Sequence, residues 1–265
     1  MSQAHTRRNI LHWLAGLPLL AVGATSTAAA KAVAKAASIG RLIEQARALP
    51  QVAQRIDFIS HALLGVRYQA HTLIGGPKYP ERFVVRDDAF DCVTFCEVAL
   101  AAAIAPDLDE FETALRRIRY QHGTVQWHQR NHYFADWGQR NIANGICEAV
   151  KIEPSVVIDK IVTWHRALGR HPVSILAVPK AAFLEQTGLL APGDIIGFTS
   201  RRSGLDYFHT GLIAFDKDRT LLLRHASQSR GRVIEEKMIS FCTVNPVQFV
   251  TLLRATEKPH VAGSH

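Results

Sequence analysis

The sequence is organised around residues 88–100, DAFDCVTFCEVAL. An acidic loop leads into Asp91, and a mostly apolar run then continues from Cys92 to Ile104 with neither Gly nor Pro. Aspartate is a preferred residue before the first turn of a helix, so this pattern predicts a helix capped by Asp91, with Cys92 in its first turn. Because the run is apolar on nearly every side, we expect this helix to be buried centrally.

Cys92 is a candidate nucleophile. A thiol in the first turn of a helix lies at the positive end of the helix dipole, which favours the thiolate. The alternative is a packing role, because cysteine is among the most buried residue types. Cys96 lies one turn deeper on the same face and is interpreted as a core residue, and two cysteines placed in this way do not favour a disulfide.

Residues 1–30 have the features of an export signal. Residues 6–11, TRRNIL, resemble the twin-arginine motif, an apolar segment follows over 13–24, and three alanines at 28–30 suit signal cleavage. The apolar segment is too short for a typical membrane span, although an uncleaved anchor is the alternative. We therefore expect export by the twin-arginine route to the periplasm or beyond, with one mature domain over 31–265 and no stable membrane span after cleavage.

Composition narrows the class of protein. The 265 residues with 48% hydrophobic content can bury a substantial core. A formal net charge of +8 suits an anionic partner such as a cell-wall polymer, while nucleic acid is not expected as a partner of an exported protein. Four cysteines are too few for a disulfide scaffold, although Cys147 and Cys242 could pair after export.

Helical patterns dominate the first two thirds of the chain and strand patterns the last third. Besides the Cys92 helix, the predicted helices cover 32–48, 52–64, 108–120, 136–144 and 154–168, and a connecting segment over 172–190 contains a short helix at 180–187. Residues 66–74 are predicted to be extended. Predicted strands cover 193–199, 206–215, 220–227 and 249–254, with a shorter candidate at 233–234. Short turns between successive strands favour an antiparallel meander, so the predicted fold class is α+β.

Residues 121–137 combine three histidines with several aromatic residues. His128 and His132 have the i, i+4 spacing of a zinc site, but no glutamate follows His128 as in His-Glu-x-x-His, and no cysteine pair is near. No metal or other cofactor is therefore predicted. Crowded aromatic and polar side chains favour a groove for a sugar or peptide, and a half-buried packing cluster is the alternative.

His209 and His225 lie in two consecutive predicted strands. A three-residue turn would pair Phe215 with Arg219 and place the two histidines directly opposite each other, with Cβ atoms ~4.5–5.5 Å apart. A turn one residue longer or shorter would send them to opposite faces. With the predicted helix packed on this sheet, Cys92 would be the nucleophile, His209 its base, and His225 the group that orients the base.

Six segments in order resemble a known family. They are 65–68 (GVRY), 71–73 (HTL), 90–95 (FDCVTF), 132–137 (HYFADW), 193–196 (GDII) and 225–227 (HAS). Together with His-x-Gly at 209–211, they are similar to the NlpC-type cell-wall hydrolases. The resemblance is closer to one branch, long catalogued as a domain of unknown function, that is similar to N-acetylmuramoyl-L-alanine amidases.

This resemblance implies a papain-like core in which the buried nucleophile helix packs on a C-terminal antiparallel sheet, with additional helices. It also implies hydrolysis of the amide between the muramic acid lactyl group and L-alanine in peptidoglycan fragments, including anhydro-muropeptides. Tyr68 is then expected to assist the oxyanion or orient substrate. Thr72, Tyr133, Asp136 and Trp137 are the other residues expected to bind substrate.

Two other functions use the same sequence features. A γ-D-glutamyl endopeptidase would apply the same three catalytic residues to the stem peptide. A non-catalytic wall-binding protein would keep the groove without needing the thiol.

Cys96 departs from the apolar residue expected at its position, which leaves Cys92 as the nucleophile and adds a site of possible oxidation.

Overall fold

The computed structural model describes residues 39–163 and 165–257. The predicted signal over 1–30 lies outside these residues, as does the start of the first predicted helix, whose described part is helical over 39–46. Among the described residues, no helix has the length and apolarity that crossing a membrane requires.

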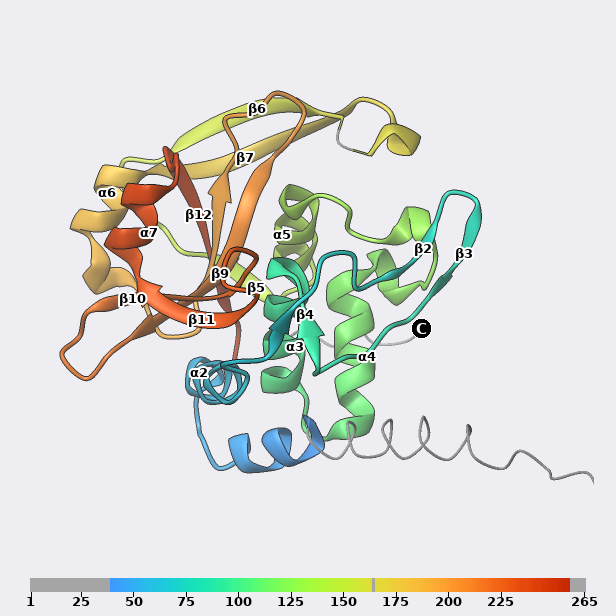
Figure 1. The fold of residues 1–265 in the computed structure, drawn as a ribbon, viewed down its shortest axis with the longest axis horizontal. Coiled ribbons are helices and arrows are strands. Elements are labelled where there is room, and N and C mark those ends of the chain that lie inside the picture. The colour runs from blue at the N-terminus through green and yellow to red at the C-terminus, as the bar shows by residue number, and fades with distance from the viewer. Residues whose placement is uncertain (1–38, 164, 258–265) are drawn as a thin grey trace, which may run out of the picture. The chain divides into compact units, whose positions relative to one another are not determined.

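The predicted Cys92 helix is confirmed as α3, Cys92–Ile104, and it is central to the fold (Figure 1). Ten of its residues are buried, from Thr94 to Ala103, as expected for a run that is apolar on nearly every side. Its neighbours α2 (Val52–Ala62) and α4 (Leu108–Arg119) pack against it. The helix therefore holds Cys92 on a rigid element.

The main sheet has the strand order β4-β1-β11-β10-β9-β8-β12-β7-β6, and β5 pairs with β12. All neighbours are antiparallel except β1 and β4. The predicted antiparallel meander is confirmed as β8 to β11, and β12 joins the free side of β8. The strands of this sheet are β1 (Arg67–Tyr68), β4 (Ala89–Phe90), β5 (Cys147–Ala149), β6 (Val156–Val162), β7 (His171–Pro179), β8 (Ile195–Thr199), β9 (Tyr207–Phe215), β10 (Leu221–Ser227), β11 (Arg232–Lys237) and β12 (Phe249–Ala255).

The two faces of this sheet carry different hydrophobic clusters. Alternate residues of β9 point to opposite faces, so Leu212 joins the cluster with α3 while Ile213 joins the cluster with α6 and α7. The remaining elements are a small hairpin and short helices. They are β2 (Ile74–Gly76), β3 (Tyr79–Arg82), α5 (Phe134–Ala143), α6 (Lys180–Glu185), α7 (Met238–Val244) and the 3₁₀ turns Gln121–Gly123, Trp127–Gln129, Arg166–Leu168 and Thr187–Leu189.

The helix predicted over 154–168 is wrong, because β6 occupies this region and pairs with β7. The connecting segment predicted over 172–190 likewise contains β7 before its short helix. Residues 156–162, VVIDKIV, are rich in β-branched side chains, which favour a pleated strand over a helix. Strands are therefore not confined to the last third of the chain, but the α+β class is confirmed.

The predicted register of the β9–β10 hairpin is wrong by two residues. Phe215 pairs with Leu221, so the turn is longer than expected. Asp216 explains the turn, because its Oδ1 atom accepts the main-chain N–H groups of Asp218 and Thr220 at 2.9 and 2.8 Å. A two-residue difference keeps each side chain on its face, so the two histidines remain neighbours along a diagonal.

Candidate active site

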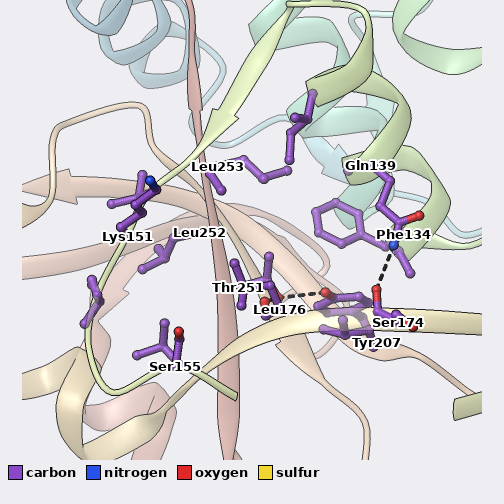
Figure 2. Close-up of a pocket in the computed structure, with 18 of the residues that line it drawn as sticks. Phe134, Gln139, Lys151, Ser155, Ser174, Leu176, Tyr207, Thr251, Leu252 and Leu253 are labelled. Atoms are coloured by element: carbon purple, nitrogen blue, oxygen red, sulfur yellow. Dashed lines mark hydrogen bonds between the residues drawn. The ribbon is translucent and has the colours of Figure 1, made fainter. Parts of the chain in front are cut away.

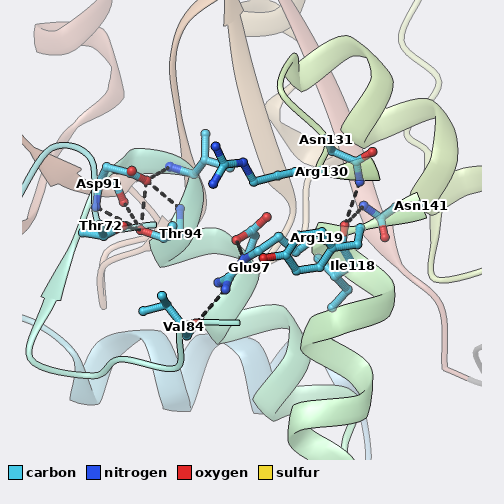
Figure 3. A network of polar contacts seen from close by, with 12 residues as sticks. Thr72, Val84, Asp91, Thr94, Glu97, Ile118, Arg119, Arg130, Asn131 and Asn141 are labelled. Atoms are coloured by element: carbon cyan, nitrogen blue, oxygen red, sulfur yellow. Dashed lines mark hydrogen bonds and ion pairs between the residues drawn. The ribbon is translucent and has the colours of Figure 1, made fainter. Parts of the chain in front are cut away.

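Asp91 and Thr94 fix the start of α3 (Figure 3). Asp91 Oδ1 accepts the N–H groups of Val93 and Thr94 at 3.1 and 2.8 Å. In return, Thr94 Oγ1 accepts the Asp91 N–H at 3.0 Å. This reciprocal cap satisfies helix-end donors that would otherwise be unpaired, and it holds Cys92 at the first helical position.

A buried ion pair anchors α3 one turn below Cys92. Arg119 of α4 donates through Nε to Glu97 Oε2 at 2.7 Å, and its Nη1 donates to the Val84 carbonyl at 2.6 Å (Figure 3). Both charged side chains are almost completely buried. Removing either residue would leave the charge of the other buried and unpaired, which is strongly destabilising. The ion pair therefore holds α3 and α4 in fixed register.

The Cys92 thiol lies against β9 at the main-chain N–H of Thr210, the residue that follows His209. The β9–β10 ladder ends at the pair of Leu212 and Arg224. Beyond that end, the main-chain N–H of Thr210 favours the Cys92 thiolate and lowers its pKa, as do the N–H groups of Cys92 and Val93. The structure therefore brings the predicted nucleophile to the strand that carries the predicted base.

His209, His225 and Glu236 form a continuous hydrogen-bonded chain. The Nε2 atom of His209 lies 2.6 Å from His225 Nδ1, and His225 Nε2 lies 2.9 Å from Glu236 Oε1. A carboxylate only accepts, so His225 donates from Nε2 and accepts at Nδ1, and His209 donates from Nε2. This assignment of protons from the network leaves the Nδ1 lone pair of His209 available as a base.

Gly211 lets β10 approach closely enough for this chain to form. A Cβ atom at this position would lie 2.9 Å from both His225 Cβ and the Arg224 carbonyl oxygen. Such distances force one strand to move. The glycine of the His-x-Gly motif is thus needed on steric grounds, which the sequence alone does not reveal.

The thiol and the imidazole are both neutral at rest. Burial raises the pKa of Cys92 to about 12, and the negative charge of Asp91 adds to the rise. Burial also lowers the pKa of His209 to about 3, with a further contribution from His225. Phe241 of α7 contributes to this burial, since its ring centre lies 5.5 and 5.6 Å from the two imidazole rings. Desolvation therefore outweighs the helix end in its effect on the pKa of Cys92.

Tyr68 lies near Cys92 and Asp91. Its pKa is raised first by burial and then by the charges of Cys92 and Asp91. Its main-chain N–H donates to the Gly231 carbonyl at 2.8 Å, which ties β1 to the turn before β11. The Tyr68 hydroxyl thus keeps its proton and can donate near Cys92.

Three of the other predicted substrate residues are buried. Thr72 is only 4% exposed and lies beneath the helix cap, with its Oγ1 3.5 Å from Thr94 Oγ1. Tyr133 and Trp137 are 2% and 0% exposed and belong to the cluster with α3. These side chains pack within the core, and their role in binding substrate stays a prediction.

Asp136 remains partly exposed. Its Oδ1 atom lies 3.0 Å from His171 Nε2, which connects α5 to the start of β7. The ring of Tyr133 stacks on that of His171 with centres 5.4 Å apart. Asp136 is thus the one predicted groove residue of this motif whose side chain reaches the surface.

A cavity of about 380 Å³ lies among α5, β7 and β12, away from these residues (Figure 2). Its lining is mainly apolar, and the Tyr207 hydroxyl forms a 2.7 Å hydrogen bond with Thr251 Oγ1 there. None of Cys92, His209 and His225 lines it. The cavity is therefore separate from the candidate active site.

All four cysteines are unpaired. Cys147 and Cys242 belong to the two different hydrophobic clusters on opposite faces of the sheet, so the disulfide considered for them does not form.

Sequence reasoning also missed Glu236. The only available signal was its place two residues beyond the short predicted strand at 233–234, and the carboxylate meets His225 only through the β10–β11 register.

The sequence over residues 58–248 matches the family described as AmiA-like, N-acetylmuramoyl-L-alanine amidase-like. An N-acetylmuramoyl-L-alanine amidase from Bacteroides uniformis ATCC 8492 is similar in structure, with a TM-score of 0.68 and 25% identity over 77% of this chain and 99% of that one. A Legionella pneumophila protein of the family DUF1460 gives a TM-score of 0.75 at 20% identity, over 88% of this chain and 98% of that one. Among curated proteins, none matches this chain.

Proposed function

The chain belongs to the N-acetylmuramoyl-L-alanine amidase-like family, and from this premise we propose that it is a cysteine hydrolase of peptidoglycan fragments. The proposed bond is the amide between the N-acetylmuramoyl lactyl group and L-alanine, with small anhydro-muropeptides among the substrates. The observation that carries the proposal is the hydrogen-bonded chain of His209, His225 and Glu236 beside the Cys92 end of α3.

The neutral resting pair defines the first chemical step. As the Cys92 sulfur attacks the amide carbonyl carbon, His209 Nδ1 takes the thiol proton, so no stable thiolate is needed beforehand. The imidazolium that forms is stabilised through His225 by the negative charge of Glu236. His225 and Glu236 thus act as positioning residues for the base.

The tetrahedral intermediate carries a negative oxygen. The Cys92 N–H at the start of α3 and the Tyr68 hydroxyl are its proposed donors. Collapse breaks the C–N bond, His209 returns its proton to the leaving amine of L-alanine, and a thioester joins Cys92 to the lactyl carbonyl. Water then attacks the thioester with His209 as base, which releases the muramoyl acid and restores the thiol.

The proposal also covers the fold, the extent of the domain, the place where it acts and its partner. The fold is proposed to be a papain-like, NlpC-type core, supported by a nucleophile helix packed on an antiparallel sheet that carries two histidines. The domain is proposed to span 31–265 and to act in the periplasm or beyond after twin-arginine export. Its partner is peptidoglycan or a muropeptide.

Product analysis tests the function. We would incubate the protein with defined muropeptides, with and without the anhydro ring, and identify the products by mass spectrometry. Release of a peptide that begins with L-alanine is the expected result. Cleavage within the stem would instead establish a stem-peptide endopeptidase, and binding without cleavage would establish a wall-binding protein.

A further inference from the structure

Two arginines face the same side of the sheet as the histidine pair. Arg67 of β1 is paired directly with Arg232 of β11, and Arg232 is paired in turn with Ser227 of β10. Directly paired residues share a face, as do residues two apart along a strand. Both arginines therefore lie on the face that carries His225 and Glu236.

This arrangement leaves positive charge without a protein counter-charge. Like charges opposite each other on neighbouring strands are destabilising. Both side chains are exposed, and within the described part of the chain neither Arg67 nor Arg232 forms an ion pair. Arg67 donates only to the neutral Gln69 Oε1 at 3.1 Å.

A third guanidinium approaches the same acceptor. Arg86 Nη2 lies 3.4 Å from Gln69 Oε1, while Arg86 is itself paired with Asp88 through two hydrogen bonds. The charge of Arg86 is thus matched, whereas Arg67 beside it is not. A guanidinium fork of this kind suits a carboxylate, which it can bind through two parallel hydrogen bonds.

The spacing agrees with a peptide that leaves the nucleophile across the sheet. Neighbouring strands are ~4.8 Å apart, so β11 and β1 lie ~10 and ~15 Å from β9, against which the Cys92 thiol lies. An extended peptide advances ~3.3–3.6 Å per residue, so the second residue after the scissile amide begins ~7 Å from the thiol, and its side chain and the long arginine side chains extend toward each other across the remaining distance. In a peptidoglycan stem that residue is a D-glutamyl group, which carries carboxylate.

We infer that Arg67 and Arg232 form a subsite for the carboxylates of the stem peptide. This inference rests on the proposed amidase function and adds a basis for substrate choice. An amidase with this subsite favours stems with free carboxylates over amidated ones. The preference weakens as salt rises, because both arginines are exposed to solvent.

Two substrates test the subsite, an N-acetylmuramoyl-L-alanyl-D-glutamate with both glutamyl carboxyls free and the same compound with both carboxyls amidated. In the double variant Arg67→Gln with Arg232→Gln, KM for the free acid should rise by about fivefold to tenfold with kcat unchanged. KM for the amidated compound should not change. An equal loss on both substrates, or no loss on either, would overturn the subsite.

Lys217→Gln is the matched control. Lys217 is exposed in the turn at the other end of the β9–β10 hairpin, and its replacement removes one positive charge, where the double variant removes two. We expect this variant to keep the wild-type preference, so a similar loss in it would mean that net charge alone matters.

The melting temperature of the double arginine variant gives a second readout, because loss of the arginine pair should not lower it, whereas loss of a structural pair would.

Binding separates failure of the subsite from failure of the proposed function. If the wild type cleaves neither compound, the amidase proposal fails. Calorimetry with the Cys92→Ala protein still decides on the arginines. Tighter binding of the free acid, lost in the double variant, would support the subsite, and equal binding of the two compounds would refute it.

Discussion

At the scale of single residues, burial of the Cys92 thiol determines how it reacts. Because the pKa is raised to about 12, the thiolate fraction at pH 7 is very small. Iodoacetamide should therefore alkylate Cys92 more slowly at pH 7 than it alkylates free cysteine, and the rate should climb steadily as pH rises toward 12. Peptide mapping of the alkylated protein measures this rate, with the Cys92→Ala protein as the blank. A rate that is already constant from pH 6 to 9 would mean a resting thiolate.

Glu236 offers a prediction with a neighbouring control. Glu236→Gln removes the charge that stabilises the imidazolium through His225, so kcat should fall by about tenfold to a hundredfold with little change in KM. Glu235→Gln removes the same charge one residue earlier, but Glu235 pairs with the buried Arg224. That control should lower stability and leave kcat unchanged. Equal kcat in the two variants would remove Glu236 from the relay.

Residue identity predicted part of this site. Cys92, His209 and His225 were predicted because a capped helix start and a His-x-Gly strand are visible in the sequence. The pKa of the thiol was not predictable, since it depends on how deeply the thiol is buried. The burial of Tyr133 and Trp137 was equally hidden, because aromatic residues with polar neighbours fit both a groove and a core.

At the scale of elements, Gly211 determines how closely β9 and β10 approach. Gly211→Ala places a methyl group 2.9 Å from His225 Cβ, so we expect a loss of stability of about 1–3 kcal/mol and at least a tenfold loss of activity. Gly188→Ala is the control, because nothing lies within 4 Å of a Cβ there. Denaturation curves and turnover rates give both readouts. Wild-type behaviour of Gly211→Ala would show that the strands can separate without cost.

The elements also show where pattern reasoning succeeds. The helix from Cys92 to Ile104 was predicted from its cap and its unbroken apolar run, and the structure confirms both bounds. The β6–β7 hairpin was not, because apolar residues three apart at 158 and 161 also fit a helix. The β9–β10 register required the side-chain hydrogen bonds of Asp216, and the error did no harm to the site only because it was an even number of residues.

At the scale of the whole molecule, the fold joins residues that are far apart in the sequence. Cys92 comes from the first half of the chain, whereas His209, His225 and Glu236 come from a meander near its end. The net charge of +8 predicted an anionic partner. The sequence could not locate that charge, because Arg67 and Arg232 become neighbours only when β1 pairs with β11.

The central claim is that Cys92 carries out the hydrolysis, and one pair of variants tests it most directly. Cys92→Ala and Cys96→Ala each remove one sulfur atom from the same helix, at positions one turn apart. Cys96 is buried, and its thiol lies 3.9 Å from Thr210 Oγ1. We would measure release of the L-alanyl peptide from a muropeptide by each folded variant. We predict complete loss in Cys92→Ala and near wild-type turnover in Cys96→Ala. Retained cleavage by Cys92→Ala would contradict the account.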